Sequence, residues 1–321
     1  MPLSGPFRVG LFPTGGAIPE DLQIGRSRVI EQITAHALGG QTQFLAEDRH
    51  LGKSSVLLAM VDRALGEPEP DCLVLSVDLR DGISSSRRLA QILLAQATQQ
   101  NAGLKISGLA KRGALARLRQ PARVGLAKAG ELLGFQDEAA VVEAIGQALT
   151  PRDDTTLADA LKALDARGHA ANARTIIAVD EAQELATWED SHAVQQCLAT
   201  TIKRGESTVA FVFSGSEKHT VAALFETANA PLHGLGIRRS LPPISRDDWV
   251  TGLINRYDQA GIAIDPDTIH KILYYSHELP LPTMLICQHT LDWLEKDRVT
   301  AATVDQAIND ARRHPSWDLP A

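Results

Sequence analysis

Residues 41–58 read Gln-Thr-Gln-Phe-Leu-Ala-Glu-Asp-Arg-His-Leu-Gly-Lys-Ser-Ser-Val-Leu-Leu. It begins with a short apolar run, 42–46, which is typical of a buried strand. A polar loop follows and ends in Gly52-Lys53-Ser54, and the apolar residues after Lys53 recur at helical spacing. The stretch therefore predicts a strand, a loop and a helix in direct succession.

The residues Gly52, Lys53 and Ser54 suit the binding of phosphate groups. Gly52 lets backbone N–H groups approach phosphate oxygens, and a helix beginning near Lys53 directs the positive end of its dipole at them. Lys53 would bridge the β- and γ-phosphates of a nucleotide, and the Ser54 hydroxyl would bind Mg²⁺. The three residues match the end of the P-loop pattern G-x-x-x-x-G-K-[ST].

The first glycine of that pattern is missing, because Glu47 occupies its position and Asp48 follows. Two like charges about 4 Å apart repel by up to roughly 4 kcal/mol at an effective dielectric of about 20, so carboxylates at this point oppose triphosphate binding. On this stretch alone, an ordinary Gly-Lys-Ser at the start of a helix is the alternative interpretation.

Composition limits the class of protein. The chain has 321 residues, of which 44% are apolar and 22% charged, as expected for one large globular domain or two. Its net charge of −7 argues against a protein that coats nucleic acid over its whole surface. Cys72, Cys197 and Cys287 are too scattered to indicate zinc or a disulfide framework. With no signal-peptide pattern and no apolar run of membrane-spanning length, we expect a soluble, cytoplasmic protein.

Two further apolar runs are typical of buried parallel strands. Residues 72–77 precede Asp78, and residues 175–179 precede Asp180-Glu181. Strands that alternate with helical patterns predict an α/β fold with a parallel sheet. An apolar strand that ends in two carboxylates is the Walker B arrangement, in which Asp180 would bind Mg²⁺ and Glu181 would polarise the attacking water. The alternative is a strand followed by an acidic helix start.

A third run, 208–213, ends in Ser214-Gly215-Ser216. In an ATPase of this layout, a polar side chain at that strand end lies beside the γ-phosphate. The segment does not match G-x-S-x-G, since the flanking glycines are absent, so we reject a serine hydrolase.

The remaining segments are predominantly helical. Residues 84–170 contain no convincing strand, and residues 105–128 carry seven basic residues and no acidic one. A basic helical stretch can contact a DNA backbone or an anionic membrane, but a solvated helix face is the favoured interpretation. From residue 245 onward, the periodicity predicts four short helices at 246–257, 266–275, 282–294 and 300–312.

With these pieces placed, residues 20–312 resemble the AAA+ ATPases of the STAND and archaeal-type clades, relatives of initiator and transposition ATPases. The resemblance rests on segments similar to five elements of the family. They are the Gly-Arg element (24–26), the Walker A loop (48–55), the Walker B strand (177–183), the end of the sensor strand (213–216) and the approach to the lid (230–234 and 241–245).

The resemblance implies a P-loop parallel sheet with helices on both faces, followed by a small helical lid. The expected organisation is an irregular segment, a nucleotide-binding domain with a helical insertion, a lid and a tail, at 1–23, 24–244 (insertion 84–170), 245–312 and 313–321. ATP and Mg²⁺ are the expected cofactors.

The resemblance also assigns site residues. Those expected to bind nucleotide are Gly25, Arg26, Arg49, His50, Leu51, Gly52, Lys53, Ser54, Ser55 and Pro280. Those expected to act in catalysis are Glu181, Lys53, Ser214, Ser216, Arg238 and Arg239, while Ser54 and Asp180 would bind the metal.

Two further departures from the family pattern affect these assignments. Leu235 stands where these proteins often have an arginine, which leaves Arg238 or Arg239 as charge donors. In the lid, Glu278-Leu279-Pro280 replaces the usual Gly-x-Pro.

Three functional hypotheses follow. The leading one is an ATP-binding, slowly hydrolysing AAA+ module that acts as a nucleotide-dependent switch, in a homo-oligomer or with a partner protein. The second is a nucleotide-bound scaffold or regulator without turnover, which Glu47 favours and Asp180-Glu181 disfavours. The third is a DNA-associated ATPase that uses the basic insertion 105–128.

Overall fold

The computed structural model describes residues 10–66, 72–100, 120–294, 296–315 and 317. The chain forms two compact units, each with its own hydrophobic core. One unit comprises residues 1–30, 48–59 and 241–321, and the other comprises 31–47 and 60–240. We call them the P-loop–lid unit and the sheet unit.

The sheet unit contains a five-stranded parallel sheet with the strand order β2-β3-β4-β1-β5. The strands are β1 (Gln43–Ala46), β2 (Leu73–Asp78), β3 (Thr175–Asp180), β4 (Val209–Gly215) and β5 (Ile237–Arg239). Every residue of β1, β3 and β4 is buried, which explains why these segments are apolar almost without interruption. The predicted α/β parallel-sheet fold is confirmed.

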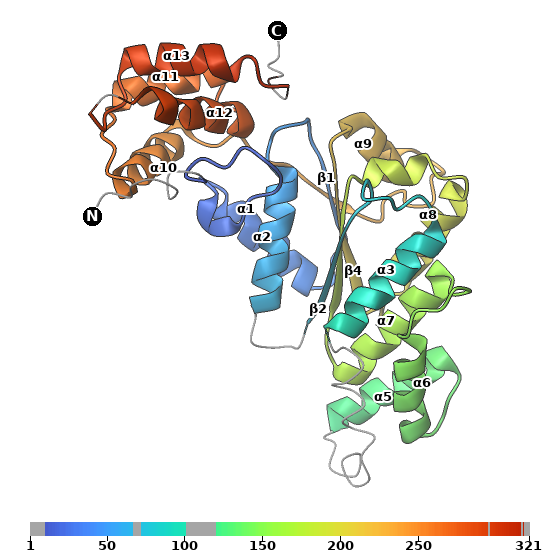
Figure 1. Ribbon diagram of the computed structural model, residues 1–321. Helices are drawn as coiled ribbons and strands as arrows, with labels where there is room; N and C mark the ends of the chain where they lie inside the picture. Colours follow the sequence, from blue (N-terminus) through green and yellow to red (C-terminus); the bar gives the residue numbers. More distant parts are fainter. Residues whose placement is uncertain (1–9, 67–71, 101–119, 295, 316, 318–321) are drawn as a thin grey trace. The chain divides into compact units, whose positions relative to one another are not determined.

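Helices alternate with these strands along the chain. Their bounds are α1 (Ser27–Leu38), α2 (Lys53–Gly66), α3 (Ser86–Gln99), α5 (Gln120–Leu133), α6 (Glu138–Ala148), α7 (Leu157–Ala171), α8 (Ser191–Lys203) and α9 (Lys218–Glu226). Figure 1 shows α3, α7 and α8 along one side of the sheet, and α5 and α6 packed on α7. The described part of residues 84–170 is helical, without a strand.

Aromatic rings pack in the core of the sheet unit. Phe44 of β1 stacks on Phe225 of α9 with ring centroids 4.4 Å apart, and Phe213 of β4 lies 5.2 Å from Phe225. Phe44 is 2% exposed and Phe213 is fully buried. This cluster therefore fixes β1, β4 and α9 to one another.

The P-loop–lid unit contains four C-terminal helices, as predicted: α10 (Arg246–Gln259), α11 (Pro266–Ser276), α12 (Pro280–Thr290) and α13 (Ala301–Ala311). Side chains of Ser245, Asp265 and Thr300 cap three of them. The third helix begins at Pro280, not Pro282, because proline suits the first helical position. Phe12 packs against Tyr257 in this core, with ring centroids 4.6 Å apart, so the N-terminal segment contributes to the lid.

Strand β5 was not expected from the sequence, and the basic run can be described only in part. The sequence analysis does not predict β5, whose three residues include two arginines and form no apolar run. Most of the basic run 105–128 lies outside the described residues, and in the described part Lys128 pairs with Glu206 at 2.8 Å. No described helix is long and apolar enough to cross a membrane.

The aromatic cluster gives a stability prediction. We expect Phe44→Ala to lower the free energy of unfolding by about 3–5 kcal/mol, because it leaves a cavity between β1 and α9. Val124→Ala, at a side chain that is 53% exposed, is the control and should change it by less than about 0.5 kcal/mol. Urea denaturation measures both, and equal effects would contradict the proposed packing role.

Candidate functional site

The predicted phosphate-binding loop leads directly into α2, which begins at Lys53. Lys53 is 6% exposed, and its Nζ donates a hydrogen bond of 2.6 Å to the Asp48 carbonyl oxygen. His50 and Gly52 have φ angles of 66° and 83°. Backbone turns of this hand contribute to concave anion-binding sites, which is compatible with the predicted role of the loop.

Arg26 links three segments of the P-loop–lid unit. Its side chain is buried, and its guanidinium donates to the carbonyl oxygens of Leu51 in the loop and Pro242 before the lid. Gly25 precedes it in the chain and is exposed, as is Arg49. Arg26 therefore ties the loop to the start of the lid, and its side chain is committed to backbone carbonyls.

Ser55 and Gln23 join the N-terminal segment to α2. The Ser55 hydroxyl accepts a hydrogen bond of 3.1 Å from the Ile18 backbone N–H. The Gln23 side chain donates to the carbonyl oxygens of Ser55, at 2.7 Å, and Ile18, at 3.0 Å. Ser55 is one of the predicted nucleotide-binding residues, whereas Gln23 was not predicted, because it lies in the segment expected to be irregular.

A small apolar cavity lies beside the phosphate-binding loop. Its lining residues are Ile18, Leu22, Gln23, Ile24, Arg26, Leu51, Gly52, Ser55, Ile244, Trp249, Pro280 and Met284. The cavity thus brings together Arg26, Leu51, Gly52, Ser55 and Pro280 of the predicted nucleotide-binding residues. Its volume is about 50 Å³, room for one or two water molecules, so a larger ligand requires these side chains to move apart.

The lid segment before Pro280 explains one departure from the family pattern. Glu278 has a φ of 59°, a left-handed conformation that glycine adopts without strain. Its carbonyl oxygen accepts from the Trp249 indole N–H at 3.2 Å, and its carboxylate pairs with Arg246. These contacts hold Glu278 in a conformation that favours glycine.

The carboxyl ends of three neighbouring strands meet in the sheet unit. The pairing of β2 with β3 sets Asp78 opposite Asp180, and β4 adjoins β3 on its other side. Asp180 is 8% exposed and accepts a hydrogen bond from the Ser214 hydroxyl at the end of β4. Asp180 and Ser214 thus lie together, as their predicted roles require.

Glu181 follows β3 in a left-handed conformation, with a φ of 53°. Its Oε1 forms an ion pair of 2.7 Å with Arg80, which follows β2. Its Oε2 accepts hydrogen bonds from the Ser216 hydroxyl, at 2.7 Å, and from the Gln183 amide. The sequence analysis named Glu181 and Ser216 as catalytic residues and assigned no role to Arg80 or Gln183.

These contacts decide the charge of Glu181. Burial opposes ionisation, but the hydrogen bonds from Gln183 and Ser216 and the charge of Arg80 outweigh it and lower the pKa of the carboxyl below its ordinary value. Glu181 is therefore ionised at neutral pH and already has three donors.

The two predicted charge donors on β5 have partners within the sheet unit. Arg238 forms an exposed ion pair of 2.9 Å with Glu226. Arg239 Nε donates to Gln43 Oε1 at 2.7 Å, while its buried Nη2 has no hydrogen-bond partner among the described residues. Their proposed action on a phosphate therefore requires Arg238 or Arg239 to leave these contacts.

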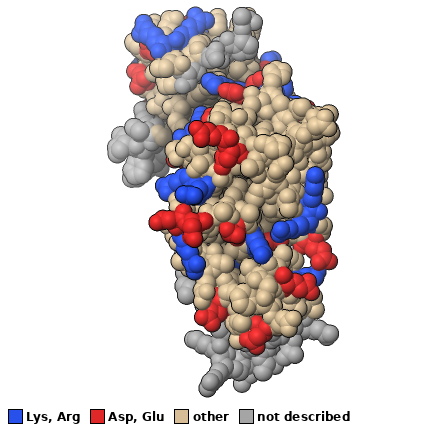
Figure 2. Space-filling view, turned by 90° about the vertical axis from the view of Figure 1, so that its right-hand side faces the viewer, with Lys and Arg blue, Asp and Glu red and all other residues tan. Residues whose placement is uncertain are grey.

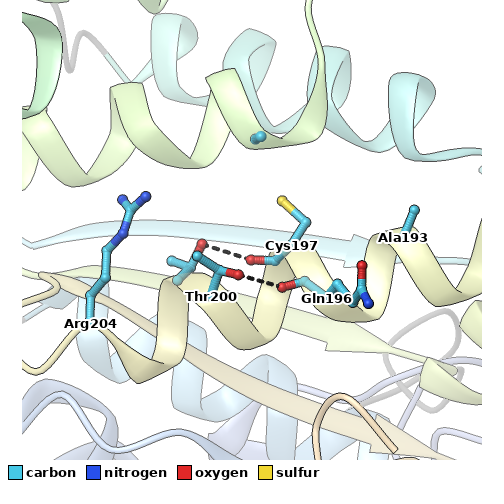
Figure 3. A pocket seen from close by; sticks show the side chains of 7 residues that line it. Ala193, Gln196, Cys197, Thr200 and Arg204 are labelled. Carbon is cyan, nitrogen blue, oxygen red and sulfur yellow. Dashed lines mark hydrogen bonds between the residues drawn. The ribbon is translucent and has the colours of Figure 1, made fainter.

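Another hollow in the sheet unit offers little chemistry. It lies between α7 and α8, and Figure 3 shows that Thr200 bonds within α8 to the carbonyl oxygen of Gln196. Burial raises the pKa of the Cys197 thiol there, which disfavours a reactive thiolate.

On the face shown in Figure 2, acidic and basic side chains are interspersed.

The lowered pKa of Glu181 predicts how its stabilising effect depends on pH. The effect is full above the unfolded-state pKa, near 4.5, and is lost as pH falls through the lower folded-state value. We expect Glu181→Gln to lower the free energy of unfolding by about 1–3 kcal/mol at neutral pH and by less in acid. Exposed Glu189→Gln controls for loss of a carboxylate, and a Glu181→Gln effect that grows in acid would contradict this assignment.

Comparison with known proteins gives a likeness in structure alone, since no protein-family model and no curated protein matches the sequence. A Walker-type ATPase of Pyrococcus abyssi superposes with a TM-score of 0.64 at 14% identity, over 94% of this chain and 75% of that one. The Aeropyrum pernix ORC2 protein, solved with ADPNP and ADP, gives a TM-score of 0.61 at 12% identity, over 97% and 72%. The ORC1 protein of the same organism, solved with DNA, gives 0.54 at 14%, over 95% and 69%. This likeness confirms the predicted fold, a parallel sheet of the P-loop type with helices and a helical C-terminal part.

Proposed function

We propose that the chain binds ATP with Mg²⁺, hydrolyses it slowly and uses nucleotide state to switch the conformation of its lid. The observation that carries the proposal is the arrangement at the end of β3, where Ser214 holds Asp180 and Ser216 holds Glu181. In a P-loop ATPase fold, a strand end of this kind presents one carboxylate to the metal and the next to water. A structural role alone does not require two adjacent carboxylates with separate serine donors.

The phosphate groups would bind at the start of α2. Lys53 Nζ now donates to the Asp48 carbonyl oxygen, and a triphosphate would replace that acceptor with its own oxygens. The Ser54 hydroxyl and the Asp180 carboxylate are hard oxygen donors of the kind that Mg²⁺ prefers, so the chemistry of each suits the ion. When bound, Mg²⁺ neutralises charge on the phosphate oxygens.

The base of the nucleotide would enter the apolar cavity beside the loop. This cavity of about 50 Å³ must widen, and its wall includes Ile244, Trp249, Pro280 and Met284 around and within the lid helices. Binding would therefore favour a lid conformation that differs from the one observed, which is how a ligand shifts a two-state equilibrium. The nucleotide complexes of the ORC2 protein support an adenine nucleotide for this fold.

Slow turnover follows from the contacts of Glu181. A carboxylate accepts the proton of an attacking water only through an available oxygen. Here Oε1 is paired with Arg80 and Oε2 accepts from Gln183 and Ser216. The Arg80 side chain is 55% exposed, so it can move into solvent and release Oε1. The same contacts also favour the second candidate, a nucleotide-bound scaffold in which Arg80 never leaves.

One experiment separates these functions. We would measure binding of a fluorescent ATP analogue with Mg²⁺ and phosphate release for wild type, Lys53→Ala and Glu181→Gln. The ATPase proposal predicts that Lys53→Ala loses binding, while Glu181→Gln binds normally and loses at least about 100-fold in phosphate release. Normal binding with turnover unaffected by Glu181→Gln would support the scaffold, and no binding by wild type would contradict both.

Arg80 gives a second prediction. We expect Arg80→Ala to raise the basal rate of phosphate release severalfold, because Glu181 loses a competing cation and gains basicity. Arg87→Ala, on an exposed arginine of α3, is the matched control and should leave the rate unchanged. A rate for Arg80→Ala equal to or below that of wild type would show that Arg80 does not restrain the carboxylate.

A further inference from the structure

Gln183 lies in the short 3-10 helix Ala182–Ala186 that follows Glu181. Its side chain is 5% exposed, and its Nε2 donates to Glu181 Oε2. The left-handed backbone at Glu181 turns the chain at this point, so that two side chains separated by a single residue meet.

The hydrogen bond to Glu181 defines the orientation of the Gln183 amide. Its nitrogen donates to Glu181 Oε2, so its oxygen faces away from the carboxylate. That oxygen is buried and has no hydrogen-bond partner among the described residues. A buried acceptor without a partner costs free energy and calls for an explanation.

The end of β4 leaves room for this amide. A Cβ atom at Gly215 would lie 2.4 Å from Gln183 Oε1 and 2.4 Å from Val221 Cγ2, closer than real Cβ contacts allow. Glycine at this position therefore leaves space both for the buried amide and for Val221 of α9. The amide lies beside β4 with its nitrogen bonded to Glu181 and its oxygen without a partner among the described residues.

We propose that Gln183 is a positioning residue for hydrolysis: it fixes Glu181 Oε2, so that Oε1 becomes the proton acceptor when Arg80 leaves. This inference rests on the proposed ATPase function. The exposed Arg80 is the partner that can leave, whereas Gln183 is buried and stays. A proton of the attacking water then passes to Oε1, the water oxygen bonds to the γ-phosphorus, and the bond from that phosphorus to the bridging oxygen of ADP breaks.

The kinetic test uses Gln183→Met, which keeps the approximate shape but cannot donate. We expect its kcat for ATP to fall about tenfold while its KM and its affinity for the fluorescent ATP analogue stay within about twofold of wild type. In a Glu181→Gln background, Gln183→Met should cause no further loss. A merely structural role would change affinity as well, and an unchanged kcat would overturn the proposal.

A second measurement reports the contact without relying on turnover. Gln183→Glu places a second carboxylate against Glu181, so the melting temperature should fall by several degrees. Exchanging the pair, Glu181→Gln with Gln183→Glu, restores one donor and one acceptor and should recover most of that loss. Failure of the exchange to recover stability would overturn the pairing, because the two side chains would then act independently.

The two measurements also separate failure of this inference from failure of the proposed function. If wild type releases no more phosphate than Lys53→Ala, the ATPase function and the positioning role both fail, even when the pair exchange restores stability. If wild type hydrolyses ATP and Gln183→Met matches it, only the positioning role fails.

Discussion

Parallel pairing of β3 with β2 on one side and β4 on the other is the constraint on which the candidate chemistry depends. All three strands end at the same edge of the sheet, so each delivers a polar residue to one place. β3 contributes Asp180 and Glu181, the chain after β2 contributes Arg80, and the end of β4 contributes the serine donors. Burying these polar groups between apolar strands costs free energy, and the hydrogen bonds that the groups form with one another offset this cost.

The contacts of Glu181 link this geometry to the slow hydrolysis that we propose. A left-handed, non-glycine residue that follows a strand directly is strained, and such strain is typical of functional sites. Its carboxylate is ionised and is held by the exposed Arg80 and by Gln183 and Ser216, which are more buried. The contact with Arg80 can therefore break while the other two remain. In the P-loop–lid unit, Lys53 is likewise held by a loop carbonyl oxygen and the cavity beside it is narrow. Under the proposed function, each unit would therefore have to change its conformation for hydrolysis.

Much of this could be predicted from the sequence, and the exceptions have physical reasons. The strands that became β1 to β4 are continuous apolar runs, so their positions were predictable to within a residue or two, whereas β5 is too short and too basic to give that signal. Arg80 could not be found, because the sequence does not show that β2 neighbours β3. The N-terminal segment looked irregular because of its glycines and prolines, yet Phe12 and Gln23 bind it to the lid core and to α2. The predicted roles of Arg238 and Arg239 stay predictions.

The most direct test of the account is a structure of the chain with Mg²⁺ and a non-hydrolysable ATP analogue. We expect the triphosphate at the start of α2 against Lys53, Mg²⁺ on the Ser54 hydroxyl and near Asp180, and the base within a widened cavity beside Trp249. An analogue bound elsewhere, or a triphosphate at Lys53 with Asp180 and Glu181 far from the metal and the γ-phosphate, would contradict the proposed function.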